Sequence, residues 1–378
     1  MTVGSAHVGT RWVIGWDVGG AHLKACLLRD GQVFGVAQQV CPLWQGLEHL
    51  DRAVAQVLAA WPDAAGARHA VTMTGEMADC FANRQQGVQQ IAERMAQHLG
   101  RRTSFFAGDH GWCGVEDAAQ HWEHIASANW LATARHAAQR LGDGVLVDIG
   151  STTTDFIAFR ACRVLGTSRS DAQRLASGEL VYHGTVRTPL CGVARRIRWR
   201  DTEYNVMNEF FATSADVYRL TGELNAAHDL HPSADGAAKD LPRTRQRLAR
   251  MIGLDAHEGS DADWLAFAHA WRAEQVSELA GQLDRVLASH AVPAGAPLVS
   301  AGCGDFLVPS LSGALSAAQG GSTGRTCLRY GESVARVAAD APAGTKAWAQ
   351  VCAPSVAVAA LFDEAHADGA AAAMERPQ

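Results

Sequence analysis

Residues 148–155 read Asp148-Ile149-Gly150-Ser151-Thr152-Thr153-Thr154-Asp155, and they lie between the apolar runs 145–147 and 156–159. This pattern predicts a strand, a tight turn of small residues and a returning strand. The tip of such a hairpin exposes backbone N–H groups and hydroxyls, and glycine lets a ligand approach the backbone closely. The stretch therefore suits a phosphate, although an Asp-Gly turn between two strands is more often only a turn.

The chain opens with the same device. Residues 12–16 predict a buried strand that ends at Asp17, and a second strand is expected from Leu23 to Leu28 after the turn Val18-Gly19-Gly20-Ala21-His22. Asp17 and Asp148 stand at corresponding places, each directly before a turn of small residues. A repeated hairpin indicates two lobes whose phosphate-binding tips face a central cleft.

A third turn, Gly302-Cys303-Gly304-Asp305, follows another short apolar run. Together the three turns favour a nucleotide or a diphosphate, held from both lobes and closed over by the late turn. Asp17 and Asp148 are then the candidate ligands of Mg²⁺, which proteins usually hold through one or two carboxylates and several waters. The alternative is three turns with a purely structural role.

The length of 378 residues allows two domains. We expect a first lobe at 1–142 with a closing segment at about 348–363, and a second lobe at 143–347. An Ala-rich tail from 364 to 378 is expected to be disordered. Among the expected helices are one over 117–140, which is long and lacks Pro and Gly, and one over 204–221.

The net charge of -6 gives no reason to expect nucleic acid or an anionic membrane as a partner. No apolar run approaches the roughly 20 residues of a membrane helix, and no signal peptide is visible at the N-terminus. The nine cysteines form no Cys-x-x-Cys pair, so neither a disulfide framework nor a zinc knuckle is predicted. We therefore expect a cytoplasmic protein, and a homo-oligomer stays open because no assembly motif is legible.

The paired hairpins and the late Gly-x-Gly resemble the actin-like superfamily, which includes sugar and acetate kinases and the 70-kDa chaperones. The segment 178–190, which reads GELVYHGTVRTPL, is similar to the hydantoinase/oxoprolinase-related proteins. Residues 71–79 and 205–218 are similar to members linked to tetrahydromethanopterin-dependent one-carbon transfer. The resemblance runs from about residue 12 to about 360 and implies an α/β, two-lobed actin-like ATPase (ribonuclease H-like) fold.

This resemblance also implies an activity. The archaeal relatives are condensing enzymes of methanofuran biosynthesis, which join an aminomethylfuran-methyl diphosphate to the phenol oxygen of a glutamyl-tyramine and release diphosphate. The implied function is a transferase of methanofuran or methylofuran biosynthesis that uses a tyramine or tyrosine acceptor. Ionisation of the furfuryl-type C–O bond needs stabilisation of the departing diphosphate, by Mg²⁺ and backbone donors, more than it needs a strong nucleophile.

Under this interpretation Asp17 and Asp148 position Mg²⁺, and Asp155 or Glu209 takes the phenol proton. The phosphate grip and its flanks comprise Gly19, Gly20, Lys24, Gly150, Ser151, Thr152, Thr153, Gly302, Gly304 and Asp305. The acceptor contacts comprise Glu76, Arg187, Thr213 and Asp216. Glu209, Thr213 and Asp216 are three to four residues apart, so a helix would place them on one face. The alternative for Glu209, Thr213 and Asp216 is a solvated helix face. The alternative for Lys24 is an exposed position on a strand, and that for Glu76 is a solvated loop.

The arginines at 187 and 195–200 form a basic cluster that suits the carboxylates of an anionic substrate tail, although such a run is more often a solvated surface. Other functions stay open beside the transferase. One is an ATP-dependent small-molecule kinase, with Asp155 or Asp216 as the base. Another is a nucleotide-binding pathway protein without catalysis. A hydantoinase-like hydrolase is less favoured, because those enzymes resemble the chain only over the shared core.

Overall fold

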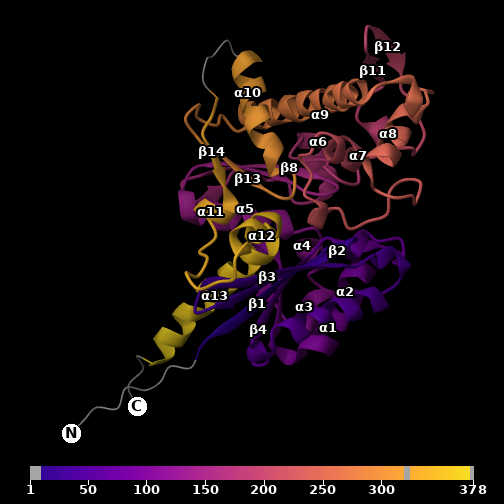
Figure 1. The fold of residues 1–378 in the computed structure, drawn as a ribbon. Coiled ribbons are helices and arrows are strands. Elements are labelled where there is room, and N and C mark those ends of the chain that lie inside the picture. The colour runs from indigo at the N-terminus through magenta and orange to yellow at the C-terminus, as the bar shows by residue number, and fades with distance from the viewer. Residues whose placement is uncertain (1–9, 319–323, 375–378) are drawn as a thin grey trace. The chain divides into compact units, whose positions relative to one another are not determined.

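The computed structural model describes residues 10–318 and 324–374 (Figure 1). The chain forms two compact units. The first unit is built from residues before 137 and after 330, and the second unit from residues 137–330. Helices α5 (Asn129–Leu141) and α11 (Tyr330–Ser333) lie at the two divisions in the sequence. Within the described ranges, no helix is both long enough and apolar enough to span a membrane.

A six-stranded sheet with the order β3-β2-β1-β4-β5-β6 organises the first unit. Its strands are β1 (Trp12–Val18), β2 (His22–Arg29), β3 (Gln32–Val40), β4 (Arg68–Met73), β5 (Thr103–Phe106) and β6 (Trp112–Cys113). Alternate residues of a strand face opposite sides of a sheet. On β1, Ile14, Trp16 and Val18 face the core that the sheet shares with helices α1 (Glu48–Ala60) and α2 (Arg84–Leu99).

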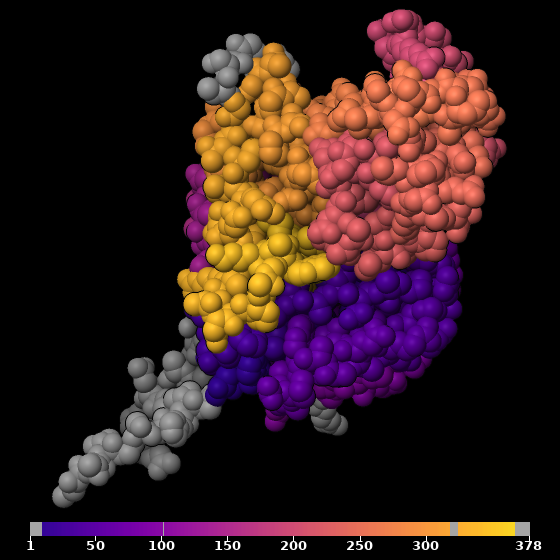
Figure 2. Space-filling view, in the orientation of Figure 1, coloured from indigo at the N-terminus to yellow at the C-terminus, as the bar shows by residue number. Residues whose placement is uncertain are grey.

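The other face of β1 packs against the C-terminal helix α13 (Ala353–Met374), which follows α12 (Thr345–Val351). The helix approaches closely because Gly15 has no side chain, and a Cβ there would lie 2.2 Å from the Ser355 carbonyl oxygen. Figure 2 shows this yellow C-terminal segment against the indigo N-terminal part of the same unit. Pro354 does not interrupt α13, because it occupies the first turn, where its missing N–H is not needed.

The second unit contains a sheet with the order β10-β8-β7-β13-β14, and β9 pairs with β8. The strands are β7 (Gly144–Ile149), β8 (Thr154–Arg160), β9 (Arg163–Val164), β10 (Leu180–Val181), β13 (Leu298–Ala301) and β14 (Cys327–Arg329). A separate hairpin pairs β11 (Arg196–Trp199) with β12 (Thr202–Asn205). The helices are α6 (Asp171–Ser177), α7 (Ser214–Leu220), α8 (Leu241–Arg250), α9 (Asp261–Ser289) and α10 (Val308–Ala318).

Aromatic packing anchors α9 in this unit. Trp264, Phe267 and Trp271 are buried along one side of the helix. Trp199 of the β11–β12 hairpin stacks on Trp264 with ring centroids 4.1 Å apart. Buried aromatic side chains contribute a large apolar area and prefer offset or edge-to-face contacts. The hairpin is therefore fixed to α9 by its inward-facing tryptophan, while its arginines face solvent.

Both sheets have one topology. The first three strands of each pair antiparallel in succession, and the fourth and fifth then run parallel to the first. This confirms the internal repeat and the expected ribonuclease H-like α/β class. In each unit the first and fourth strands, β1 with β4 and β7 with β13, are parallel neighbours. Their carboxyl ends lie at the same sheet edge, which is where α/β folds place ligands.

The prediction of one long helix over 117–140 is wrong. The region contains three helices, α3 (Val115–Ala118), α4 (Trp122–Ile125) and α5. Ser127 between α4 and α5 has a φ of +50°. An L-residue in this left-handed region cannot continue a right-handed helix, so the composition predicted a continuity that the backbone does not have.

The helix expected over 204–221 is also shorter. Only α7 is helical there, Thr213 is its N-cap and residues 206–212 form a loop. Glu209, Thr213 and Asp216 therefore do not share a helical face. At the C-terminus, α13 continues through 364–374, which was expected to be disordered. Alanine is the strongest helix former, which explains the extension. Residues 375–378 lie outside the described residues.

We expect Gly15→Ala to lower the free energy of unfolding of the first unit by about 1–3 kcal/mol, because the added methyl group overlaps the α13 backbone. Gly66→Ala is the matched control, since a Cβ there meets nothing within 4 Å. Urea unfolding followed by circular dichroism measures both variants. Equal midpoints for the two would contradict the close packing of β1 on α13.

Candidate functional site

The Asp148 turn and the late glycine turn lie together in the second unit. Asp148 pairs with Ala301 in the parallel β7–β13 ladder. Beyond it, the Gly304 amide donates to the Ile149 carbonyl at 2.8 Å. Gly302 has a φ of +82°, and a Cβ there would lie 2.2 Å from the Ile149 oxygen and 2.6 Å from Asp148 Oδ1. The predicted third turn thus packs directly against the predicted phosphate turn.

Residues 184–188, here named the brace loop, support the same turn from its other side. The amides of Val186 and Arg187 donate to the Ser151 carbonyl at 3.1 and 2.8 Å, and the Thr185 amide donates to the Gly150 carbonyl at 3.0 Å. At Gly184 a Cβ would lie 2.4 Å from the Ser151 carbonyl carbon. Sequence reasoning used this segment for its resemblance but gave Gly184 and Thr185 no site role. The glycine in a Gly-Thr pair was the one local signal of the contact.

The donors of the turn are left open. The Gly150 amide closes the turn on the Thr153 carbonyl at 2.8 Å. Within residues 10–318 and 324–374, the N–H groups of Ser151, Thr152 and Thr153 donate to no protein acceptor. The Ser151 hydroxyl is buried and has no partner among the same residues. Successive free N–H groups form an anion-binding concavity, so the turn has the chemistry of a phosphate grip.

The carboxylates around this turn already have cationic neighbours. Asp155, the strand partner of Asp148, accepts a 2.6 Å hydrogen bond from the buried Arg174. Asp305 forms an ion pair with Arg329 at 3.0 Å. Neither arginine was anticipated from the sequence, because each comes from an element remote from its partner. The role of Asp155 as a base stays a prediction, and its carboxylate is held by Arg174.

The side chains of Thr213 and Asp216 have structural roles. They form a reciprocal capping box at the start of α7, in which each side chain bonds the other residue's backbone N–H. Asp216 is also buried and accepts from Arg247 and Arg219, each at 2.8 Å. Glu209 is exposed in the preceding loop. The capping signal, a threonine followed three residues later by an acid, was present in the sequence.

Arg187 is half-buried, and burial lowers the pKa of its guanidinium. Its backbone belongs to the brace loop, so the residue lies beside the phosphate turn. The other members of the predicted basic cluster lie on or next to the β11–β12 hairpin. There Arg196 pairs with Glu203 at 3.4 Å, with both side chains largely exposed. The structure therefore separates Arg187 from the exposed arginines of the cluster.

The first unit presents the corresponding turn. Asp17 is buried at the end of β1, and Lys24 on β2 is its strand partner, with Nζ 3.8 Å from Asp17 Oδ2. The Gly20 carbonyl accepts from the Leu43 amide at 3.0 Å. The lysine ammonium competes with any metal cation for Asp17, and it adds positive charge beside the Gly19–Gly20 turn.

Glu76 lies at the same edge of the first sheet. The Thr74 amide donates to the Val18 carbonyl at 2.9 Å. Gly75 approaches the first turn closely, since a Cβ there would lie 3.2 Å from the Gly19 carbonyl carbon. The two segments are close because β1 and β4 are parallel neighbours, so both strands end at the same edge of the sheet. The structure thus brings the predicted acceptor contact Glu76 next to the first phosphate turn.

The Glu76 side chain is fully buried. Its Oε1 accepts from Ser127 Oγ at 2.7 Å and from Arg84 at 3.2 Å, and Arg84 also donates to Ser127 Oγ at 2.8 Å. Its Oε2 has no partner among the described residues. Burial raises the pKa of Glu76, and the hydrogen bond from Ser127 and the charge of Arg84 offset this in part. Ser127 lies at the break between α4 and α5, inside the range 117–140 that was expected to be one helix.

No group of three or more His, Cys, Asp or Glu side chains within residues 10–318 and 324–374 is arranged to hold a metal ion. Asp17 and Asp148 belong to different units. Mg²⁺ does not require a protein cage, since one or two carboxylates with water and phosphate oxygens suffice. The carboxylate at Asp148 beside free N–H donors has the right donor chemistry, and the Mg²⁺ site remains a prediction.

The chain belongs to the hydantoinase/oxoprolinase family, whose model matches residues 68–319. It is similar to the (4-{4-[2-(gamma-L-glutamylamino)ethyl]phenoxymethyl}furan-2-yl)methanamine synthase of Methanocaldococcus jannaschii, with 30% identity over 258 residues, 68% of this chain and 76% of that protein. The synthase of the same name from Methanococcus vannielii is 26% identical over 114 residues, 30% of this chain and about half (51%) of that protein.

Among solved structures, nucleotide-free acetone carboxylase superposes with a TM-score of 0.51 and 11% identity, over 79% of this chain and 66% of that one. At this identity the likeness concerns the fold alone. The acetone carboxylase therefore supports only the architecture.

We expect Ser151→Ala to change the free energy of unfolding by less than about 0.5 kcal/mol, because the lost hydroxyl has no protein partner. The same change should weaken the binding of inorganic diphosphate about tenfold, since one donor to the anion is lost. Thr154→Val is the contrast, because it removes a 2.6 Å bond to the His183 carbonyl and should lower stability by about 1 kcal/mol. Calorimetric titration and urea unfolding separate the effects. Unchanged diphosphate affinity in Ser151→Ala would contradict the proposed grip.

The raised pKa of Glu76 predicts a pH dependence of stability. Its folded-state pKa lies above the ordinary value of 4.5, so the protonated form stabilises the fold and this contribution is lost as the pH rises through the folded-state pKa. We expect the stability of the wild type to fall relative to that of Glu76→Gln as the pH rises above about 4.5. Glu93→Gln on the exposed face of α2 is the control and should follow the wild type. Urea unfolding across pH measures this, and a constant difference between wild type and Glu76→Gln would contradict it.

Proposed function

We propose that this chain is a transferase of furan-cofactor biosynthesis that joins an aminomethylfuran-methyl diphosphate to the phenol oxygen of a glutamyl-tyramine or tyrosine acceptor and releases diphosphate. The name of the Methanocaldococcus jannaschii relative supports the product class. It describes a furan-methanamine linked through a phenoxymethyl ether to a γ-glutamylaminoethyl group. The proposed reaction would form the C–O bond of such a phenoxymethyl ether.

The observation that carries the proposal is the braced turn with free donors next to Asp148. In the reaction the bond between the furan-bound methylene carbon and the diphosphate oxygen breaks, and its electron pair leaves with diphosphate. The phenol oxygen bonds that carbon and loses its proton to a base. The N–H groups of Ser151–Thr153 and the Ser151 hydroxyl suit the negative charge that grows on the departing oxygen.

Mg²⁺ would neutralise charge on the diphosphate when bound, with Asp17 and Asp148 as its proposed ligands. Lys24 and the Gly19–Gly20 turn are the proposed phosphate-binding groups of the first unit. Asp155 and Glu209 are the proposed bases for the phenol proton. In the pathway, this protein would act in the cytoplasm and serve tetrahydromethanopterin-linked one-carbon transfer.

The proposal is tested by incubating the purified protein and Mg²⁺ with the furan-methyl diphosphate and a tyramine, glutamyl-tyramine or tyrosine acceptor. Diphosphate release and product mass are measured. We expect diphosphate and the ether product in equal amounts, and a rate at least about 100-fold lower for Asp148→Asn, because a neutral amide would hold the proposed Mg²⁺ less well than the carboxylate.

Asp143→Asn is the matched control. Asp143 is exposed and bonds the Ala161 amide, which an asparagine oxygen also accepts, so its rate should equal the wild type. A parallel incubation with ATP in place of the furan diphosphate tests the kinase. ADP formed from ATP with an acceptor, without diphosphate release from the furan substrate, would refute the transferase.

A further inference from the structure

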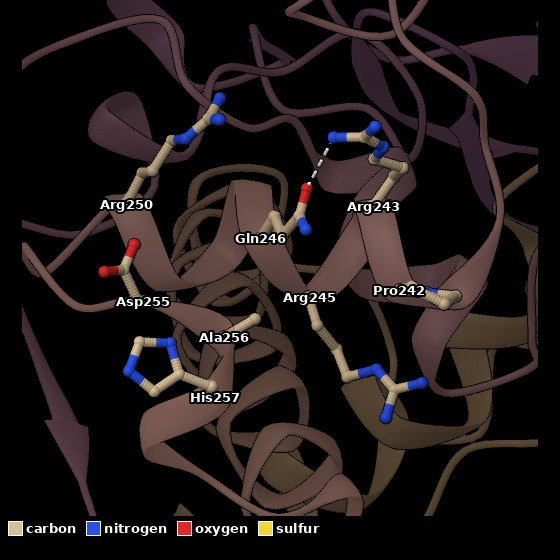
Figure 3. A pocket seen from close by; sticks show the side chains of 8 residues that line it. All are labelled: Pro242, Arg243, Arg245, Gln246, Arg250, Asp255, Ala256 and His257. Atoms are coloured by element: carbon tan, nitrogen blue, oxygen red, sulfur yellow. Dashed lines mark hydrogen bonds between the residues drawn. The ribbon is translucent and has the colours of Figure 1, made fainter.

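The second unit contains a cavity of about 650 Å³ that none of the functions considered above uses. It lies between α8 and the short segment that precedes α9 (Figure 3). Eight residues line it, namely Pro242, Arg243, Arg245, Gln246, Arg250, Asp255, Ala256 and His257. The volume is that of a small-molecule site.

Three arginines give this cavity its character. Arg243, Gln246 and Arg250 are three and four residues apart on α8, so they lie on one face of the helix. Figure 3 shows Arg243 hydrogen-bonded to Gln246, at 3.0 Å, and Arg250 farther along the same helix. The rise of an α-helix separates the Cα atoms of Arg243 and Arg250 by about 10 Å along the axis.

The nearby carboxylates do not neutralise these two arginines. Three carboxylates are shared among four cations, as Asp216 binds Arg219 and Arg247, Asp229 binds Arg219 and Lys239, and Asp235 binds Arg247 and Arg250. The contact of Arg250 with Asp235 is 3.5 Å, longer than the 3.2 Å contact of Arg247. In the described part of the chain, Arg243 has only the neutral Gln246 as a side-chain partner.

Two further charged side chains, Arg245 and Asp255, line the cavity. Arg245 forms an ion pair with Asp261. The Asp255 carboxylate is part of a capping box with Glu258, where it accepts a backbone N–H. Guanidinium groups without a carboxylate bind oxyanions through paired N–H donors. The donors that face the cavity without a full counter-charge are therefore those of Arg243 and Arg250.

We propose that this cavity binds a small molecule that carries two oxyanion groups about 10 Å apart, one at Arg243 and one at Arg250, with Gln246 between them. A dicarboxylate with a linear spacer is the ligand class that fits. The inference rests on the cavity and the charges of the second unit and is independent of the proposed transferase activity.

The test is calorimetric titration of the full chain at low salt with suberate, an eight-carbon dicarboxylate, and with octanoate, which has the same length and one carboxylate. We expect suberate to bind at least about tenfold more tightly than octanoate, and its affinity to fall as salt is added. Succinate, which cannot span the two arginines, should bind more weakly than suberate. Equal binding of suberate and octanoate would overturn the proposal.

Variants connect the binding to the cavity. Arg243→Gln with Arg250→Gln should weaken suberate binding at least about tenfold, because both changes remove charge and keep a helix-forming side chain. Arg160→Gln, at the exposed end of β8, is the matched control and should bind suberate as the wild type does. Urea unfolding checks that the double variant is folded, since the lost surface ion pair with Asp235 is worth about 1 kcal/mol or less. Suberate affinity unchanged in the folded double variant would refute the site.

Discussion

The polarity of the backbone at the Asp148 turn is the constraint on which the candidate site depends. The carbonyls of Ile149, Gly150 and Ser151 all accept amide hydrogen bonds from neighbouring segments, while the N–H groups of Ser151–Thr153 stay open. Buried polar groups are normally paired, so a turn with satisfied acceptors and free donors is complementary to an anion. Glycines at 184 and 302 make this possible, because any side chain there would collide with the turn.

The first unit repeats the same polarity with different residues. The carbonyls of Val18, Gly20 and Ala21 accept amides of Thr74, Leu43 and Cys41. Lys24 is the strand partner of Asp17 and adds a positive charge there. At the matching place in the second unit, the strand partner of Asp148 is the acidic residue Asp155. The duplicated topology thus supplies two turns of one design, and single substitutions on the second strand give them different electrostatics.

Buried carboxylates in this chain serve two distinct purposes, and residue type does not separate them. Asp216 caps a helix and binds two arginines, so its oxygens are fully used. Glu76 has one oxygen bonded and one without a described partner, and burial raises its pKa. A perturbed carboxyl at a sheet edge is a candidate for function, whereas a capped and doubly paired one belongs to the framework.

The sequence alone determined the strands that flank the three glycine turns and the repeated hairpin, because alternation of apolar residues and glycine punctuation are local signals. It also determined the family, through the segment 178–190 and its neighbours. Only the tertiary structure decided that the brace loop holds the phosphate turn, that Ser127 breaks a helix to reach Glu76, and that α8 lines a basic cavity. The contact of Ser127 with Glu76 joins residues 51 positions apart, and that of Thr185 with Gly150 joins residues 35 apart. Such partners are chosen by packing of the whole unit, so no local pattern specifies them.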